Sequence, residues 1–235
     1  MSEGTSQLPG DDLAPHDSAI PDMDDEPSFE LPLFPLRAVL FPGGLLGLKV
    51  FEARYLDLIG MCLRNNQPFG VVALRQGEEV RLAAGGAPPQ PEGDTAFEDT
   101  GVLAELIDVD SAQSGILQVR CRGTRRFSVI DSRQEPDGLW MALARFLPDE
   151  GRYPVPDTLA GSVKGLETAI ETLKGQGAEP FLEPYDFADA GWVANRWCEI
   201  LPISLAAKQK LMALPDANVR LELVHDFLRS KGVVT

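Results

Sequence analysis

The sequence predicts an α+β fold in which a β-rich half precedes a helical half. Residues 29–148 consist of short apolar runs separated by Gly, Pro and Asp turn signals, which is typical of strands. Residues 157–231 place apolar side chains at the spacing of amphipathic helices. A proline- and charge-rich joint, residues 149–156, separates the two patterns. Strands followed by helices, rather than alternating with them, indicate the α+β class.

Residues 1–28 are expected to be a disordered acidic tail ahead of this fold. Residues 1–30 contain nine acids and no Lys or Arg, and the tail has four prolines and few large apolar groups. Such a segment buries too little apolar surface to offset its ordering entropy. We interpret it as a solubilising tail, with a regulatory or autoinhibitory role as the alternative.

The net charge argues against a nucleic-acid partner. The chain carries a formal net charge of −15, of which the first 30 residues supply −9, leaving −6 for the other 205 residues. That balance is ordinary for a soluble domain, but its field repels a phosphate backbone.

The β-rich half opens with two extended segments and one helix. Residues 31–36 are apolar but interrupted by prolines, which confines them to an edge strand or an extended entry segment. Residues 45–50 are expected to form a strand after the turn at residues 42–44. Residues 53–65 follow as an amphipathic helix that ends at Asn65-Asn66. Its expected buried stripe consists of Tyr55, Leu56, Ile59, Cys62 and Leu63.

The rest of the β-rich half follows a strand and turn pattern. Residues 117–122 alternate strictly between apolar and polar, the signature of a half-buried antiparallel strand. A Gly/Pro-rich acidic loop is expected at residues 84–99, and a bend or bulge at Gly123-Thr124. The expected strands cover residues 69–74, 102–109, 117–122, 127–130 and 139–146, with turns at 110–115 and 137–138.

Four helices are expected in the helical half. The first covers residues 157–174, and the second runs from Phe187 to Leu201. Ser204 is a plausible N-cap for a third helix through Leu214, and Asp216 for a fourth. Arg196 and Glu199 fall on the polar face of the second helix. His225, near the end of the fourth, is interpreted as structural.

The residue types needed for catalysis or metal binding are scarce. The chain has only two histidines, His16 and His225, and its three cysteines are 59 and 77 residues apart. These counts weigh against a Ser–His–Asp or Cys–His site, a zinc site and a disulfide framework. Phosphate-loop, dinucleotide-binding and G-x-S-x-G motifs do not occur. We therefore expect no catalytic residues, no metal and no cofactor.

No targeting signal or membrane span is predicted. The N-terminus lacks a basic region followed by an apolar run. The most apolar stretch, residues 39–51, is interrupted by Pro and Gly and is too short to cross a bilayer. Cysteine usage favours a reduced compartment. We expect a cytoplasmic protein that does not bind membranes.

Several segments together resemble the N-terminal domain of Lon protease. The segments LPLFPL at 31–36, LFPG at 40–43 and FEARY at 51–55 are similar in order and spacing to that family's opening motifs. Further similar segments are PFGVV at 68–72, GVLAEL at 101–106, RGTRRF at 122–127, LP at 201–202, KQKL at 208–211 and RLE at 220–222. The resemblance covers about residues 30–230.

The resemblance implies a PUA-like β pseudo-barrel with one internal helix, followed by a C-terminal helical bundle. It implies a stand-alone version of the domain, because the family's ATPase and Ser–Lys peptidase domains do not follow in this sequence. The implied role is non-enzymatic recognition of unfolded or extended polypeptides, in substrate selection or as an adaptor to a protease or chaperone. Two alternatives stay open: an RNA-binding PUA-like module, and an enzyme with an unrecognised active site.

The candidate binding residues lie at strand–helix and glycine junctions, where a β scaffold often presents side chains outward. Aromatic groups there would offer contact area, and arginines would bind a carbonyl or carboxylate oxygen. The alternative is structural: Phe51 and Tyr55 in the core, Glu52 and Arg54 as a local ion pair, and Trp192 packed on the β half. The candidates are Phe51, Glu52, Arg54, Tyr55, Arg122, Arg125, Arg126 and Trp192.

Overall fold

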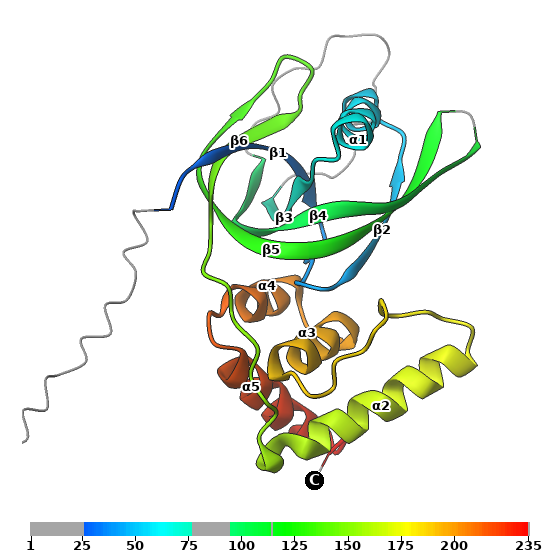
Figure 1. Ribbon diagram of the computed structural model, residues 1–235, viewed down its shortest axis with the longest axis vertical. Coiled ribbons are helices and arrows are strands. Elements are labelled where there is room, and N and C mark those ends of the chain that lie inside the picture. The colour runs from blue at the N-terminus through cyan, green and yellow to red at the C-terminus, as the bar shows by residue number, and fades with distance from the viewer. Residues whose placement is uncertain (1–25, 77–94, 114, 235) are drawn as a thin grey trace, which may run out of the picture.

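The computed structural model describes residues 26–76, 95–113 and 115–234, and it places a barrel of strands against a set of helices (Figure 1). This arrangement confirms the predicted α+β class. In chain order the elements are β1 (Phe29–Leu36), β2 (Leu45–Val50), α1 (Ala53–Asn65), β3 (Phe69–Gln76), β4 (Ala96–Gln113), β5 (Ile116–Gln134), β6 (Trp140–Phe146), a 3₁₀ turn (Asp157–Leu159), α2 (Ala160–Gly175), α3 (Ala190–Ile200), α4 (Leu205–Ala213) and α5 (Ala217–Ser230).

One mixed sheet holds the six strands in the order β2-β5-β4-β3-β1-β6, and a further pairing of β5 with β6 closes it into a barrel. The length of β5, 19 residues, makes this closure possible. Its first part pairs with β2 and β4, and its end, from Phe127, pairs with β6. Within the described strands β2 pairs with β5 alone, so β2 forms a free edge of the sheet.

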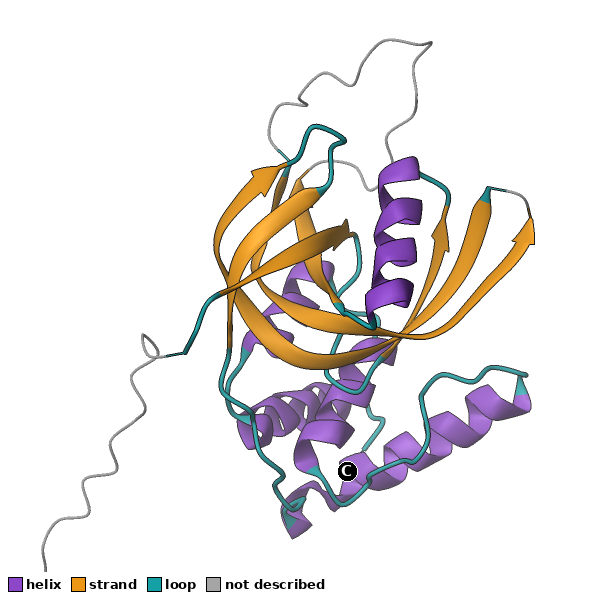
Figure 2. Cartoon of the chain, turned by 45° about the horizontal axis from the view of Figure 1, so that its top comes forward, coloured by secondary structure: helices purple, strands orange, loops and turns teal. Residues whose placement is uncertain are grey.

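Helix α1 packs its apolar face against the strands of the barrel (Figure 2). Its predicted bounds are confirmed, and Asn66 ends it in the left-handed conformation at φ 51°. The predicted stripe is partly wrong, because Leu58 is buried whereas Leu63 is 54% exposed. The buried positions instead follow the i, i+3, i+4, i+7 pattern, which centres the face on Leu58 and Ile59.

Side-chain caps fix the starts of three helices in the helical half. The Ser204 hydroxyl accepts the Ala207 N–H at 3.2 Å, and the Asp216 carboxylate accepts two N–H groups of the first turn of α5. Both predicted caps are confirmed. Helix α3 begins later than predicted, because the Asp189 carboxylate accepts the Trp192 N–H at 2.9 Å and caps it there.

The barrel and the helices share one buried apolar cluster. It joins Phe41 and Ala104 of the barrel half to Trp197 and Leu221 of the helical half. Within the helical half, the Trp197 indole N–H donates to the Ser162 carbonyl at 2.9 Å. The Ser162 hydroxyl and His225 Nδ1 lie 2.9 Å apart in the same buried region, which gives His225 a structural setting.

Strand lengths differ from the prediction. β4 begins at Ala96, inside the loop predicted at 84–99, and extends to Gln113. The earlier part of that loop, up to residue 94, and residues 1–25 of the predicted tail lie outside the described residues. The bulge predicted at Gly123-Thr124 is present, since β5 carries one residue more than β4 between the partners of Val102 and Ala104. β5 nevertheless continues through it as one strand.

Candidate functional site

The structure divides the candidate residues between two hollows. One hollow, which we call the β2 groove, is lined by Phe51, Glu52 and Tyr55 among others. The second, the barrel–helix cleft, is lined by Arg125, Arg126 and Trp192 among others. Arg122 lies opposite Leu45 at the start of β2, whereas Phe51 follows Val50 at its end. The Phe51–Tyr55 and Arg122–Arg126 segments therefore do not form one surface.

The β2 groove is a hollow of about 200 Å³ between the end of β1 and the edge strand β2, and most of its lining side chains are apolar or aromatic, with Lys49 and Glu52 as the charged members. Tyr55 is buried and stacks on Phe34, with 3.8 Å between ring centroids and 8° between ring planes. This rigid pair gives the groove a fixed aromatic wall. Phe51 is different, since 47% of it is exposed. Among Phe51, Glu52, Arg54 and Tyr55, its ring is the group that a partner can cover.

Glu52 and Arg54 stabilise the start of α1. Their side chains form an ion pair at 2.8 Å, and both are largely buried. Arg54 also donates to the Gly138 carbonyl at 2.8 Å and lies over the Tyr55 ring at 4.5 Å. The local ion pair considered in the sequence is therefore present. Arg54 therefore lies outside the proposed contact surface, because its buried guanidinium is engaged by Glu52 and Gly138.

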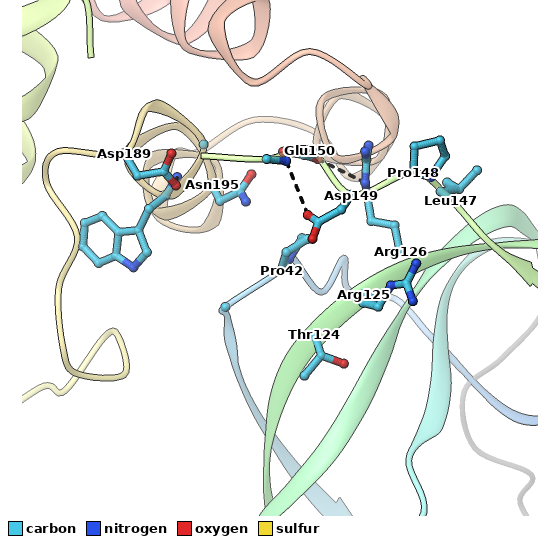
Figure 3. Close-up of a pocket in the computed structure, with 14 residues that line it drawn as sticks. Pro42, Thr124, Arg125, Arg126, Leu147, Pro148, Asp149, Glu150, Asp189 and Asn195 are labelled. Atoms are coloured by element: carbon cyan, nitrogen blue, oxygen red, sulfur yellow. Dashed lines mark hydrogen bonds and ion pairs between the residues drawn. The ribbon is translucent and has the colours of Figure 1, made fainter. Parts of the chain in front are cut away.

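Arg126 connects the barrel to the helical half across the barrel–helix cleft, a hollow of about 250 Å³ (Figure 3). Its side chain is 5% exposed, pairs with Glu150 at 3.0 Å and donates to the Leu214 carbonyl at 2.8 Å. Glu150 also receives two hydrogen bonds from buried Arg220, each 2.7 Å long. Burial lowers the pKa of Arg126, and Glu150 opposes that shift. Arg126 thus forms a buried ionic link between β5 and the helical half, which we call a strut. This differs from the exposed role expected from the sequence.

Arg125 and Trp192 both pack on aromatic rings. Arg125 is exposed and lies over the Phe146 ring at 4.0 Å. Trp192 is half-buried and contacts the rings of Phe181, Tyr185 and Phe187 at centroid distances of 5.2–6.2 Å. Trp192 therefore packs on the segment that precedes α3, while it also borders the barrel–helix cleft. Neither of these ring contacts places a catalytic type of side chain in the cleft.

Comparison with known proteins decides the family. The model of the substrate-binding domain of ATP-dependent protease La (Lon) matches residues 30–230. The chain belongs to the Lon substrate-binding domain family. This confirms the resemblance drawn from residues 31–36, 40–43 and 51–55, and with it the Lon N-terminal fold.

Relatives and solved structures agree with this family. The chain is 26% identical over 207 residues to a Lon protease of Anaeromyxobacter dehalogenans, a match that covers 86% of the chain and 23% of the relative. It is 30% identical over 204 residues to Lon protease 2 of Myxococcus xanthus, covering 86% and 24%. The chain thus spans about a quarter of the length of these relatives.

Two solved structures share the Lon-type fold. The Lon N-terminal domain protein of Xanthomonas campestris is 31% identical, with a TM-score of 0.64 and coverage of 83% of this chain and 96% of that one. The N-terminal domain of Lon protease from the Mycobacterium avium complex superposes with a TM-score of 0.55 over 86% of this chain and 98% of that one. It is 14% identical, so it supports the fold alone.

The described part of this Lon-type domain holds no cluster of three or more His, Cys, Asp and Glu residues that fits a metal ion. None of the helices in residues 26–76, 95–113 and 115–234 has the length and apolar character that a bilayer span needs.

A second strut joins α3 to the loop between β1 and β2. Arg196 is completely buried, donates to the carbonyls of Pro42 and Gly43, and pairs with Glu199 at 2.8 Å. The polar face predicted for α3 is therefore wrong at both positions. Glu199 keeps 18% of its side chain exposed, but burial raises its pKa to about 7, an effect that Arg196 and Lys208 only partly oppose.

The raised pKa of Glu199 predicts a pH-dependent stability. A pKa above the usual 4.5 means that the fold favours the protonated carboxyl. Its contribution is complete below about pH 4.5 and is lost as the pH rises through 7. Relative to Glu199→Gln, the wild type should lose on the order of 2 kcal/mol between pH 5 and pH 8. Urea unfolding of both proteins at several pH values measures this, and parallel pH profiles would contradict it.

Proposed function

We propose that this Lon-type domain is a non-enzymatic module that recognises unfolded or extended polypeptides. In this role it selects substrates for proteolysis or acts as an adaptor to a protease or chaperone. The family match supports a substrate-binding role, and the relatives are named Lon proteases. The observation that carries the proposal is the exposed ring of Phe51 at the β2 groove. An apolar group held beside an apolar hollow is suited to an apolar side chain of a client.

The proposed contact surface consists of the β2 groove and Phe51. Tyr55 contributes as a buried wall, and Glu52 as a rim carboxylate 14% exposed at its side chain. Arg122 and Arg125 are exposed on β5 but lie outside this groove. The enzyme and RNA alternatives gain no support from the groove, because its lining is mainly apolar and carries a single cation, Lys49.

Removing the Phe51 ring should weaken client binding. Phe51→Ala removes roughly half of a phenylalanine's apolar area from the contact, worth about 1 kcal/mol or about fivefold in Kd. The measurement is a fluorescence titration of a labelled, reduced and carboxymethylated protein into each variant. Leu63→Ala is the matched control, because Leu63 is 54% exposed on α1 but does not line the groove. Equal Kd values for wild type and Phe51→Ala would remove the groove from the proposal.

A further inference from the structure

We infer that the free edge of β2 binds the polypeptide backbone, so that an extended client segment adds to the sheet as a further strand. This inference rests on the proposed function and specifies how the β2 groove holds its client. An edge strand offers a row of unpaired N–H and C=O groups, and β-strand addition is a general mode of peptide recognition. Three features of β2 support it.

The first feature is the hydrogen-bond phase of β2. The Gly123 N–H donates to the Gly44 carbonyl at 2.9 Å, so residue 44 is bonded to β5. In an antiparallel pair the bonded residues alternate, so the next bonded positions are 46, 48 and 50. The N–H and C=O groups of Leu45, Gly47 and Lys49 therefore point to the free edge, where no described strand pairs with them.

The second feature is the space along this edge. Gly47 is exposed, and no atom lies within 4 Å of the position that a Cβ would occupy. A glycine inside a strand often marks a place where another backbone approaches closely. The β2 groove follows residues 47–50, and a second hollow of about 610 Å³ is lined by Leu45 and Leu46. Hollows therefore accompany β2 from one end to the other.

The third feature is charge. β2 and residues 116–126 of β5 contain no acid, although acids outnumber bases by 36 to 21 in the whole chain. Lys49, Arg120 and Arg122 are exposed on these strands, and no ion pair joins them to any described acid. The nearest acids opposite the arginines, Glu105 and Asp108, lie on β4, on the side of β5 away from the free edge. β2 and this part of β5 therefore carry more cations than acids, with Lys49 on the edge strand itself, although Glu105 and Asp108 stand opposite the two arginines.

Together these features specify the client. Leu46, Leu48 and Val50 face inward, and Lys49 faces outward. A strand added beside β2 therefore has apolar neighbours on its inner side and a lysine neighbour on its outer side. The matching occupant is an extended segment in which apolar residues alternate with acidic ones. Hydrogen bonds to the backbone can hold any extended chain. The alternation of apolar and acidic side chains makes the edge prefer such a segment over other sequences. This mode suits unfolded clients, because folded proteins seldom leave such a segment unpaired.

A synthetic peptide tests the edge directly. The probe is an acetylated and amidated heptapeptide of alternating valine and glutamate, added to the full ¹⁵N-labelled chain. At saturation, hydrogen exchange at the amides of Leu45, Gly47 and Lys49 should slow by about tenfold or more. The amides of Leu46 and Leu48, already bonded to β5, should not change. The same peptide with every amide N-methylated should bind at least about tenfold more weakly, because it keeps its side chains but cannot donate.

Two substitutions test the protein side. Gly47→Pro removes one edge N–H and leaves the bonds of Leu46 and Leu48 to β5, and it should weaken the peptide severalfold. Gly47→Ala keeps the edge N–H and adds only a methyl group into open space, so it should lose clearly less affinity than Gly47→Pro; an equal loss in both variants would contradict a role for that N–H. If Gly47→Pro does not fold, the comparison of the N-methylated with the unmodified peptide on the wild-type chain tests the inference instead.

The outcomes separate this inference from the proposed function. If the N-methylated peptide binds as tightly as the unmodified one, or if exchange at the three edge amides does not change, strand addition is wrong. Binding of unfolded protein would still support the proposed function in that case. Slow exchange at these amides before any peptide is added shows that the chain itself or a second copy covers the edge, and it also overturns the inference. Failure to bind any polypeptide overturns both.

Discussion

Replacing Glu150 with alanine is expected to lower the free energy of unfolding by about 3–5 kcal/mol. Glu150 is the shared partner of Arg126 and Arg220, whose side chains are 5% and 0% exposed. The substitution leaves two buried guanidinium groups without their carboxylate, and a lone buried charge costs far more than a paired one. The same change also breaks a direct link between β5 and α5, so we expect the helical half to loosen against the barrel.

Urea unfolding monitored by tryptophan fluorescence measures this effect. Trp192 and Trp197 lie in α3, beside the strut, and report on the helical half. Glu183→Ala is the matched control, because its ion pair with Lys174 is exposed and should contribute little. A loss below about 1 kcal/mol for Glu150→Ala would show that the strut is no stronger than a surface pair.

Replacing Gly123 with alanine should be comparably damaging. Gly123 exchanges backbone hydrogen bonds with Gly43 and Gly44, which form a bulge opposite it, and Gly43 adopts φ 72°. A Cβ at position 123 would lie 2.3 Å from the Phe41 carbonyl oxygen, so backbone must move. We expect a loss of about 3 kcal/mol or a failure to fold, because the shift separates the loop after β1 from β5.

Gly47→Ala gives the comparison for this prediction as well. A Cβ at this exposed position meets no atom within 4 Å, whereas one at the buried Gly123 meets backbone, so the comparison shows what the close packing at Gly123 contributes. Thermal unfolding followed by circular dichroism should place Gly123→Ala well below both wild type and Gly47→Ala. Similar midpoints for the two variants would contradict the close packing at Gly123.

Local signals allowed the elements of the fold to be predicted. Helix α1 and the caps Ser204 and Asp216 follow from apolar spacing and from side chains that satisfy the first N–H groups of a helix, both of which are local. The start of β4 was missed because it is set by the pairing of Ala96 with Gln76 of β3, which is 20 residues earlier in the chain. Its end was missed because the ladder with β5 continues through the predicted turn until Gln113 pairs with Ile116.

The internal charges could not be predicted in the same way. Arg126, Arg196 and Arg220 look like surface arginines, and each is buried only because a carboxylate or carbonyl from another element meets it. For Arg220 a signal existed, since it precedes Leu221 on the apolar side of α5. For Glu150 there was none, because it lies in an irregular joint between the two halves.

The candidate site was predicted in part. The FEARY segment placed Phe51 and Tyr55 together, and both line the β2 groove. Which of the two stays exposed depends on the stacking of Tyr55 on Phe34, which is 21 residues away, so the sequence could not separate them. Gly47 was not singled out, although an isolated glycine between two leucines of a strand was a visible signal.

Site-specific photo-crosslinking tests the central claim most directly. A photoreactive phenylalanine analogue is placed at position 51 in one variant and at position 63 in another, and each is irradiated with an unfolded, carboxymethylated protein. Both positions are about half exposed and both lie at α1, but only position 51 borders the β2 groove. Recognition of polypeptides at this groove predicts a strong, saturable crosslink from position 51 and little from position 63. Equal crosslinking from the two positions, or none from position 51, would contradict it.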